Sequence, residues 1–215
     1  MKNVNNRILR LVTSGVMLGL ATVLSMIKVF EFPFGGSITL FSMVPVLVLA
    51  YMYGIRWGFV CGVVYGVLQM VLGATTTQAF AGLEGWTVPV MAFLDYILAF
   101  MVLGLSGMFR GKIKNPTASI VAGSAVAVLL RFLCHFASGW ILWGSYASDF
   151  FAGLNNSFGD SILSSFDGQM LSGMYSLIYN GAYMLPELVI SIIGIFALMA
   201  VKPLKERIAN NKLAI

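Results

Sequence analysis

Six apolar stretches dominate the sequence and restrict it to a membrane protein. They cover roughly residues 8–29, 37–54, 56–74, 87–109, 118–143 and 172–201. Most of them reach the ~20 residues that a helix needs to cross a bilayer. Only 10% of the residues are charged, whereas soluble domains average about 25%. We therefore expect an all-α integral membrane protein, with residues 1–215 forming one domain of six transmembrane helices.

The connections between these stretches differ in length. Only Gly54, Ile55 and Arg56 join the second stretch to the third, which predicts a tight helical hairpin. The first stretch is too long for a signal peptide and has no convincing small-residue cleavage site, so we interpret it as a helix. A long outer loop over roughly 144–171 contains Gly, Ser, Asn and Asp, and has room for a short surface helix.

The basic residues predict the orientation in the membrane. All but two of the 13 basic residues lie before or at the start of the first stretch, after the sixth, or in the second-to-third and fourth-to-fifth connections. The exceptions are Arg131, inside the fifth stretch, and Lys28, at the outer end of the first. The positive-inside rule then puts both termini in the cytoplasm, as an even number of helices requires. No aromatic platform interleaves these charges, so we expect no nucleic-acid partner.

A polar and aromatic stripe runs through the fifth stretch. Arg131, His135, Gly139 and Trp143 recur every four residues, so a helix places them on one face. His135 is the only histidine in the chain. An arginine at the centre of a membrane helix costs about 2.5–3.5 kcal/mol on insertion scales, so such residues face a protein interior or a wet cavity. With acids in the fourth and sixth stretches, the stripe predicts a pocket for a small polar solute.

Other motifs limit the possible chemistry. Cys61 and Cys134 lie inside predicted helices without metal-ligand spacing, so we interpret them as small buried side chains and expect no metal site. No phosphate-binding glycine motif is present, so ATP hydrolysis would require another subunit. Gly15 and Gly19 in the first stretch form a small-xxx-small pattern, which lets a helix of this chain or of a partner approach closely.

Several stretches resemble the thiamine-binding substrate subunits of energy-coupling factor transporters. They are GGSITLFSMVPVLVLAYMYG, FLDYILAF, the stripe described above, and YSLIYNGAYMLPE at residues 175–187. The resemblance implies a six-helix protein of a bacterial cell membrane that binds thiamine from outside with high affinity. It also implies a non-enzymatic role without a cofactor, in assembly with a membrane coupling subunit and two cytoplasmic ATPases.

The resemblance also implies a set of site residues. The pocket residues of the family lie on helices four, five and six, and the matching positions here are Asp95, Tyr96, His135, Gly139, Trp143, Tyr175 and Asn180. Phe34, in the aromatic outer loop at 30–37, stands near the position of a pocket tryptophan in some members. Gly15 and Gly19 are the closest match to the family motif that docks the coupling subunit.

These residue types fit thiamine chemically. Its permanent thiazolium cation favours a carboxylate and aromatic faces, which Asp95, Tyr96, Trp143 and Tyr175 supply. Its aminopyrimidine needs both donors and acceptors, which His135 and Asn180 provide. The outer loop at 30–37 is either a lid over this pocket or part of an aromatic belt at the membrane surface.

Four of these site residues also have a purely structural interpretation. Asp95 could neutralise Arg131, Trp143 and Tyr175 could belong to an aromatic belt, and Asn180 could tie two helices together. We interpret Arg131 and Glu187 as structural residues that pair with each other or with the backbone.

Three alternatives also stand for the function. One is a secondary carrier that needs no ATPase, and another is a substrate subunit for a different vitamin. The third is an intramembrane hydrolase with His135 as the base and Ser138 or Ser172 as the nucleophile, although no elbow motif surrounds either serine.

Overall fold

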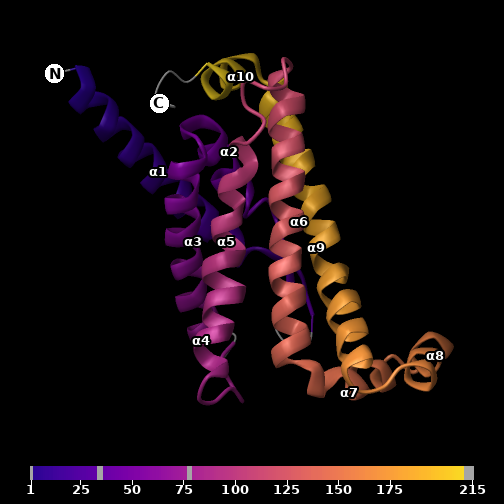
Figure 1. Ribbon diagram of the computed structural model, residues 1–215. Coiled ribbons are helices and arrows are strands. Elements are labelled where there is room, and N and C mark those ends of the chain that lie inside the picture. The colour runs from indigo at the N-terminus through magenta and orange to yellow at the C-terminus, as the bar shows by residue number, and fades with distance from the viewer. Residues whose placement is uncertain (1, 33–35, 77–78, 211–215) are drawn as a thin grey trace.

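The computed structural model describes residues 2–32, 36–76 and 79–210, and over these ranges it is mostly helical. Long helices stand side by side, and the start of α1 lies at the same end as α10 (Figure 1). In the described ranges, five helices are long and apolar enough to cross a membrane. Four of them are α1 (Lys2–Met26), α3 (Ile55–Thr76), α6 (Pro116–Leu142) and α9 (Gly168–Ala200).

The remaining span is a composite helix. It begins with α4 (Thr87–Met91), widens into a π-helical segment (Ala92–Leu98), returns to α geometry in α5 (Ala99–Met101) and ends as a 3-10 segment (Val102–Gly107). Together these four pieces form one continuous span, Thr87–Gly107.

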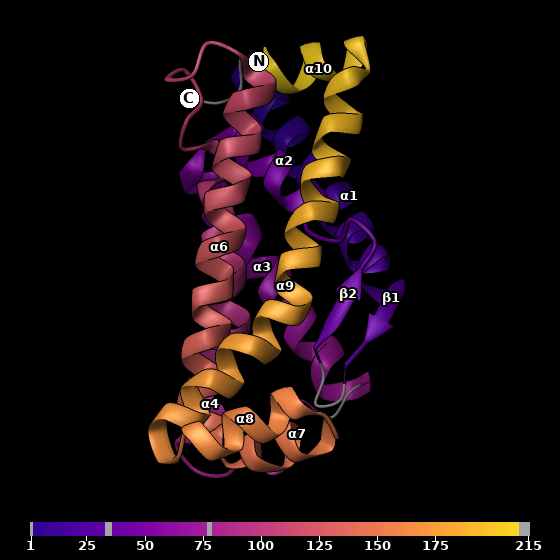
Figure 2. The same ribbon diagram turned by 90° about the vertical axis from the view of Figure 1, so that its right-hand side faces the viewer.

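The second apolar stretch is not a membrane-length helix, so the prediction for residues 37–54 was wrong. Its beginning forms β2 (Ser37–Thr39), which pairs antiparallel with β1 (Lys28–Glu31). Only α2 (Val44–Tyr53) is helical, and all ten of its residues are buried. Its hydropathy therefore reflects burial in the protein core, which composition cannot distinguish from contact with lipid. The small sheet (Figure 2) also corrects the expectation of an entirely helical fold.

A glycine stripe on α3 brings the composite span close. Gly58, Gly62 and Gly66 are four residues apart and all buried. A Cβ atom on Gly62 would lie 2.9 Å from the Cα of Met101, and one on Gly66 would lie 3.1 Å from the carbonyl carbon of Tyr96. Such distances leave no room for a larger residue, so the stripe fixes how closely the π-helical segment approaches α3.

One face of α1 packs on α2 and also contacts α3. Three hydrogen bonds spaced along α1 and α3 hold the contact between these two helices: Trp57 Nε1 to Ser14 Oγ (2.9 Å), the Tyr65 hydroxyl to the Ala21 carbonyl (3.1 Å) and Gln69 Nε2 to Ser25 Oγ (2.9 Å).

Gly15 and Gly19 lie outside this packing face of α1. Among the described residues, no atom outside the nearby backbone of α1 and the two chain neighbours comes within 4 Å of a Cβ position on either glycine. Val16 between them is 68% exposed. The alternative that this motif packs against other helices of the same chain is therefore wrong for the described structure.

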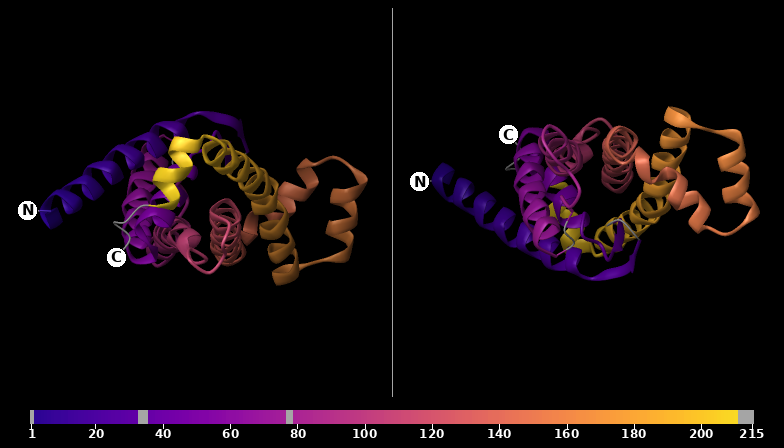
Figure 3. Two further views of the ribbon diagram at one scale, coloured as in Figure 1. Left: turned by 90° about the horizontal axis from the view of Figure 1, so that it is seen from above. Right: turned by 90° about the horizontal axis from the view of Figure 1, so that it is seen from below.

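The predicted outer loop at 144–171 is largely helical. It contains a 3-10 turn (Gly144–Tyr146), α7 (Ala147–Gly153) and α8 (Ser157–Ser165), and α9 already begins at Gly168. α8 packs on α7, and α7 packs on α9. Both short helices project beside the bundle at the end opposite α10 (Figures 1 and 3).

The two ends of the bundle carry opposite charges. One end holds α10 (Lys202–Ala209), which contains Lys202, Lys205 and Arg207, and the α2–α3 turn with Arg56. The other end holds α7 with Asp149 and α8 with Asp160. This separation matches the distribution that the sequence predicted.

Candidate functional site

A cavity of about 710 Å³ lies between the β1–β2 hairpin, α1, α3, the composite span, α6 and α9. Seven predicted site residues line it together: Asp95, Tyr96, His135, Gly139, Trp143, Tyr175 and Asn180. Phe34, the eighth, lies outside the described residues. The sequence thus identified side chains from three separate helices that the fold brings to one cavity.

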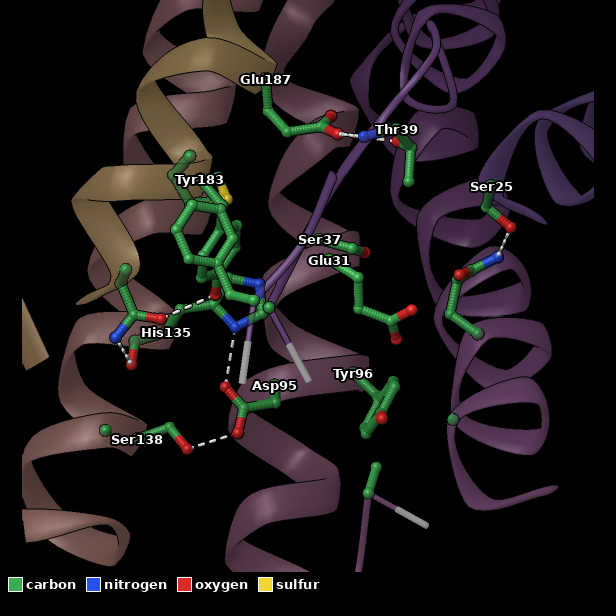
Figure 4. Close-up of a pocket in the computed structure, with 18 of the residues that line it drawn as sticks. Ser25, Glu31, Ser37, Thr39, Asp95, Tyr96, His135, Ser138, Tyr183 and Glu187 are labelled. Atoms are coloured by element: carbon green, nitrogen blue, oxygen red, sulfur yellow. Dashed lines mark hydrogen bonds and ion pairs between the residues drawn. The ribbon is translucent and has the colours of Figure 1, made fainter. Parts of the chain in front are cut away.

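Asp95 lies at the centre of a short polar network (Figure 4). Its Oδ1 atom is 2.8 Å from His135 Nδ1, and its Oδ2 atom accepts a hydrogen bond from the Ser138 hydroxyl. The Asp95 and His135 side chains are only 14% and 11% exposed. His135 Nε2 is buried and has no hydrogen-bond partner among the described residues.

The alternative role of Asp95, neutralising Arg131, is wrong. Among the described residues, no ion pair within 4.0 Å joins these two side chains. The Arg131 guanidinium instead lies 4.3 Å above the Phe100 ring, and its Nη1 atom is 2.7 Å from Met43 Sδ.

The π-helical segment explains how two successive residues reach the cavity. Asp95 and Tyr96 both belong to it and both line the cavity. A π-helix bonds residue i to residue i+5, so it shifts the side chains that follow relative to a regular α-helix, and such segments are frequent at functional sites. Nothing in the sequence pattern reveals this shift.

Tyrosines form a ladder along α9. Tyr175, Tyr179 and Tyr183 are spaced by four residues, are all buried, and line the cavity. The Tyr175 and Tyr179 rings stack at 5.5 Å, and Phe150 of α7 contacts Tyr175 at 5.2 Å. Tyr175 therefore faces the protein interior, and the alternative interpretation of this residue as part of an aromatic belt at the membrane surface is wrong. Sequence reasoning missed Tyr179 and Tyr183, although their spacing was a usable signal.

Asn180 ties α6 to α9, as its structural alternative predicted. Its Nδ2 atom donates to the carbonyls of His135 (3.3 Å) and Ser176 (2.9 Å), and its Oδ1 atom accepts from the Tyr183 hydroxyl (2.7 Å). Gly139 faces this amide across the helix contact, because a Cβ there would lie 2.9 Å from Asn180 Nδ2. Asn180 thus shapes the cavity wall with an amide that is already engaged.

Glu187 and Arg131 line the other end of the cavity. Glu187 Oε1 accepts hydrogen bonds from the Thr39 backbone N–H and from the Thr39 hydroxyl, the latter at 2.7 Å. The predicted pairing of Glu187 with backbone is therefore confirmed. Thr39 belongs to β2, so this acid holds the hairpin against α9.

The hairpin also contacts the tyrosine ladder. The Gly36 N–H donates to the Tyr179 hydroxyl at 2.9 Å, and the Phe32 ring packs edge-on against Tyr179 at 6.3 Å. Glu31 lines the cavity and pairs with Lys28 at 2.6 Å. Part of the aromatic loop thus covers the cavity, as the lid interpretation requires, and sequence reasoning overlooked Glu31.

The described residues contain no group of three His, Cys, Asp or Glu side chains that could hold a metal ion. Cys61 and Cys134 are both buried free thiols. The cavity therefore offers carboxylates, an imidazole and aromatic faces as its chemistry.

Comparisons with known proteins identify the family. A model of the family described as "Thiamine transporter protein (Thia_YuaJ)" matches residues 11–158, more than half of the chain. The chain belongs to this thiamine transporter family. The resemblance seen in the sequence is thereby confirmed, and the protein is a multi-pass protein of a bacterial cell membrane.

Relatives match over most of their length. Thiamine transporter ThiT of Bacillus subtilis is 26% identical over 212 residues, which cover 94% of this chain and 95% of that protein. Thiamine transporter ThiT of Lacticaseibacillus paracasei is 26% identical over 174 residues, which cover 76% of this chain and 73% of that protein. The solved structure of ThiT from Listeria monocytogenes has the same fold, with a TM-score of 0.66 and 24% identity over 92% of this chain and 96% of that one.

Proposed function

We propose that this chain binds thiamine in the cavity and is the substrate subunit of an energy-coupling factor transporter. The observation that carries the proposal is the Asp95 carboxylate, only 14% exposed and held by His135 and Ser138 in a cavity wall that also carries several aromatic rings. A permanent organic cation is stabilised by a carboxylate and by the faces of aromatic rings. The thiazolium ring supplies such a cation.

A binding role also fits the arrangement of the candidate catalytic groups. The Asp95 carboxylate lies between Ser138 and His135, and both hydrogen-bond to it. The imidazole is therefore not poised to remove the proton of the Ser138 hydroxyl, as a hydrolase would require. The Ser172 hydroxyl donates to the carbonyl of Gly168 within its own helix (3.1 Å). We infer that the protein is not an enzyme and needs no cofactor.

Binding is tested on the purified chain alone, by calorimetry and by tryptophan fluorescence. We expect thiamine to bind with high affinity without ATP or an ion gradient, and to quench Trp143. Of the four tryptophans, all within the described ranges, Trp143 alone lines the cavity. The matched control is Trp140→Phe, which should keep the quenching that Trp143→Phe removes. Absence of calorimetric binding at micromolar thiamine, or tight binding of a different vitamin only, would contradict the proposal.

We also propose six membrane helices, counting the short buried α2, with both termini in the cytoplasm. The positive end of the bundle, with α10, is then inside, and the acidic α7 and α8 are outside. Cysteines introduced at Lys205 and Asp160 test this with a maleimide that cannot cross the membrane. In intact cells it should label Asp160→Cys and not Lys205→Cys. Labelling of Lys205→Cys and not of Asp160→Cys would show that the topology is the opposite of the one proposed.

The exposed face of α1 supports docking of a coupling subunit that works with two cytoplasmic ATPases. Gly15 and Gly19 have open space around them, so a partner helix can approach closely. We expect Gly15→Trp with Gly19→Trp to keep thiamine binding and to abolish uptake by cells. The control pair is Val189→Trp with Ile193→Trp, two exposed residues of α9 at the same spacing, which should keep both activities.

Two results would contradict the docking proposal. One is normal uptake by the α1 double variant. The other is thiamine accumulation in liposomes that contain this chain alone, which would indicate a self-sufficient carrier.

A further inference from the structure

The inner end of the cavity, where Glu187 and Arg131 lie, contains polar atoms that have no partner in the described part of the chain. Glu187 is only 3% exposed, and its Oε2 atom has no hydrogen-bond partner among the residues that the structure describes. Arg131 Nε is likewise buried, and no described residue forms a hydrogen bond with it. Both side chains line the cavity. Buried polar groups are almost always hydrogen-bonded, so this acceptor and this donor call for a ligand group.

Glu187 and Arg131 both contact the same short segment of the chain. Glu187 holds Thr39, and Arg131 contacts Met43, four residues further on. The two unpartnered atoms therefore belong to one end of the cavity. Figure 4 shows Glu187 and Thr39 at this end and Asp95 with Ser138 at the other, with His135 and Tyr183 between them.

We propose that Glu187 and Arg131 form a subsite that recognises the aminopyrimidine edge of thiamine through hydrogen bonds. This inference rests on the proposed function and assigns the part of the ligand that Asp95 does not. The exocyclic amine donates to Glu187 Oε2, and the adjacent ring nitrogen accepts from Arg131 Nε. The thiazolium cation then lies toward Asp95 and the aromatic rings.

Thr39 makes this subsite testable with a single atom change. The Thr39 N–H and hydroxyl both donate to Glu187 Oε1. A glutamine at position 187 must therefore turn its carbonyl oxygen toward Thr39. The amide NH2 group then stands where Oε2 stood. Glu187→Gln therefore replaces an acceptor by a donor in the cavity wall and keeps the contact with the hairpin.

Oxythiamine is the matched probe. It differs from thiamine in the pyrimidine ring, where a carbonyl replaces the amine and the neighbouring ring nitrogen carries a hydrogen, so the donor and acceptor are exchanged. A site built to hydrogen-bond its substrate rejects an analogue that leaves its buried groups unpaired. We expect the wild-type protein to bind thiamine at least tenfold more tightly than oxythiamine. In Glu187→Gln this preference should fall by at least about tenfold, which corresponds to about 1.4 kcal/mol.

The control is Ser191→Ala. Ser191 is also buried, follows Glu187 by one turn of α9, and has a hydroxyl with no partner in the described ranges, but it does not line the cavity. This variant should keep the wild-type preference. Dissociation constants for both ligands are measured by calorimetry on each purified protein.

The outcomes separate this subsite from the proposed function. Equal wild-type affinity for thiamine and oxythiamine would overturn the subsite without any variant, even if Glu187→Gln does not fold. An unchanged preference in a folded Glu187→Gln protein would leave Glu187 a purely structural residue and overturn the subsite as well. Failure of the wild-type protein to bind either ligand would instead overturn the proposed function.

Discussion

Asp95→Asn should change the charge of the pocket while preserving its shape. Asparagine has nearly the size of aspartate, and its amide can repeat both contacts seen in the structure. Its oxygen can accept from the Ser138 hydroxyl, and its NH2 group can donate to His135 Nδ1. The variant therefore removes one negative charge without leaving a buried group unpaired.

The size of the effect follows from the depth of Asp95. Two unit charges 4 Å apart attract by about 1 kcal/mol in water and by about 4 kcal/mol at an effective dielectric constant of 20. The Asp95 side chain is 14% exposed, so the second value is the closer guide. We expect thiamine affinity to fall by at least about tenfold, or 1.4 kcal/mol, with larger losses up to the second value.

The assay compares thiamine with a neutral analogue that has a thiophene ring in place of the thiazolium ring. Asparagine at position 95 also favours the His135 tautomer that carries its proton on Nε2, and this change is the same whichever of the two ligands is bound. The ratio of the dissociation constants of thiamine and the neutral analogue therefore reports the effect of the Asp95 charge alone. Calorimetry should show that Asp95→Asn weakens the binding of thiamine much more than the binding of the neutral analogue. An equal loss of affinity for both ligands would mean that Asp95 only supports the fold.

Three further variants test the contacts around the cavity. Gly139→Ala places a Cβ 2.9 Å from Asn180 Nδ2, so we expect a cost of about 1–3 kcal/mol, seen as a lower melting temperature and weaker thiamine binding. Tyr179→Phe removes the hydrogen bond to the Gly36 N–H, so thiamine release in stopped-flow fluorescence should be about 2–10-fold faster; an unchanged rate would argue against a closing hairpin. Arg110→Ala removes two hydrogen bonds to carbonyl groups at the end of α2, so the melting temperature should fall while thiamine affinity stays unchanged.

The parts of the site that the sequence revealed depend on local helix geometry. His135, Gly139 and Trp143 recur every four residues, and a helix puts such residues on one face whatever the rest of the chain does. The tyrosine ladder of α9 obeys the same rule, so Tyr179 and Tyr183 were within reach of sequence reasoning. The orientation of Asp95 was not, because the π-helical segment changes the local period.

Contacts between distant segments left no trace in the sequence pattern. Thr39 and Glu187 are 148 residues apart, and nothing in either stretch indicates that the two side chains meet. The glycine stripe at Gly58, Gly62 and Gly66 was visible as a spacing, but only the structure shows that it faces the span that carries Tyr96. The resemblance to a family supplied residues that periodicity could not connect.

The error in the second apolar stretch and the origin of the inner subsite have the same physical cause. Residues 37–43 precede α2 and do not form a helix, although they lie among membrane spans. Non-helical backbone at membrane depth is tolerated only where protein or a cavity satisfies its polar groups. Here the Thr39 N–H finds Glu187 Oε1, so the acid that the irregular strand requires also stands in the cavity wall. A fully helical stretch would satisfy its own backbone and would need no buried carboxylate as a partner. The short α2, the hairpin and the polar inner end of the cavity therefore form one structural solution.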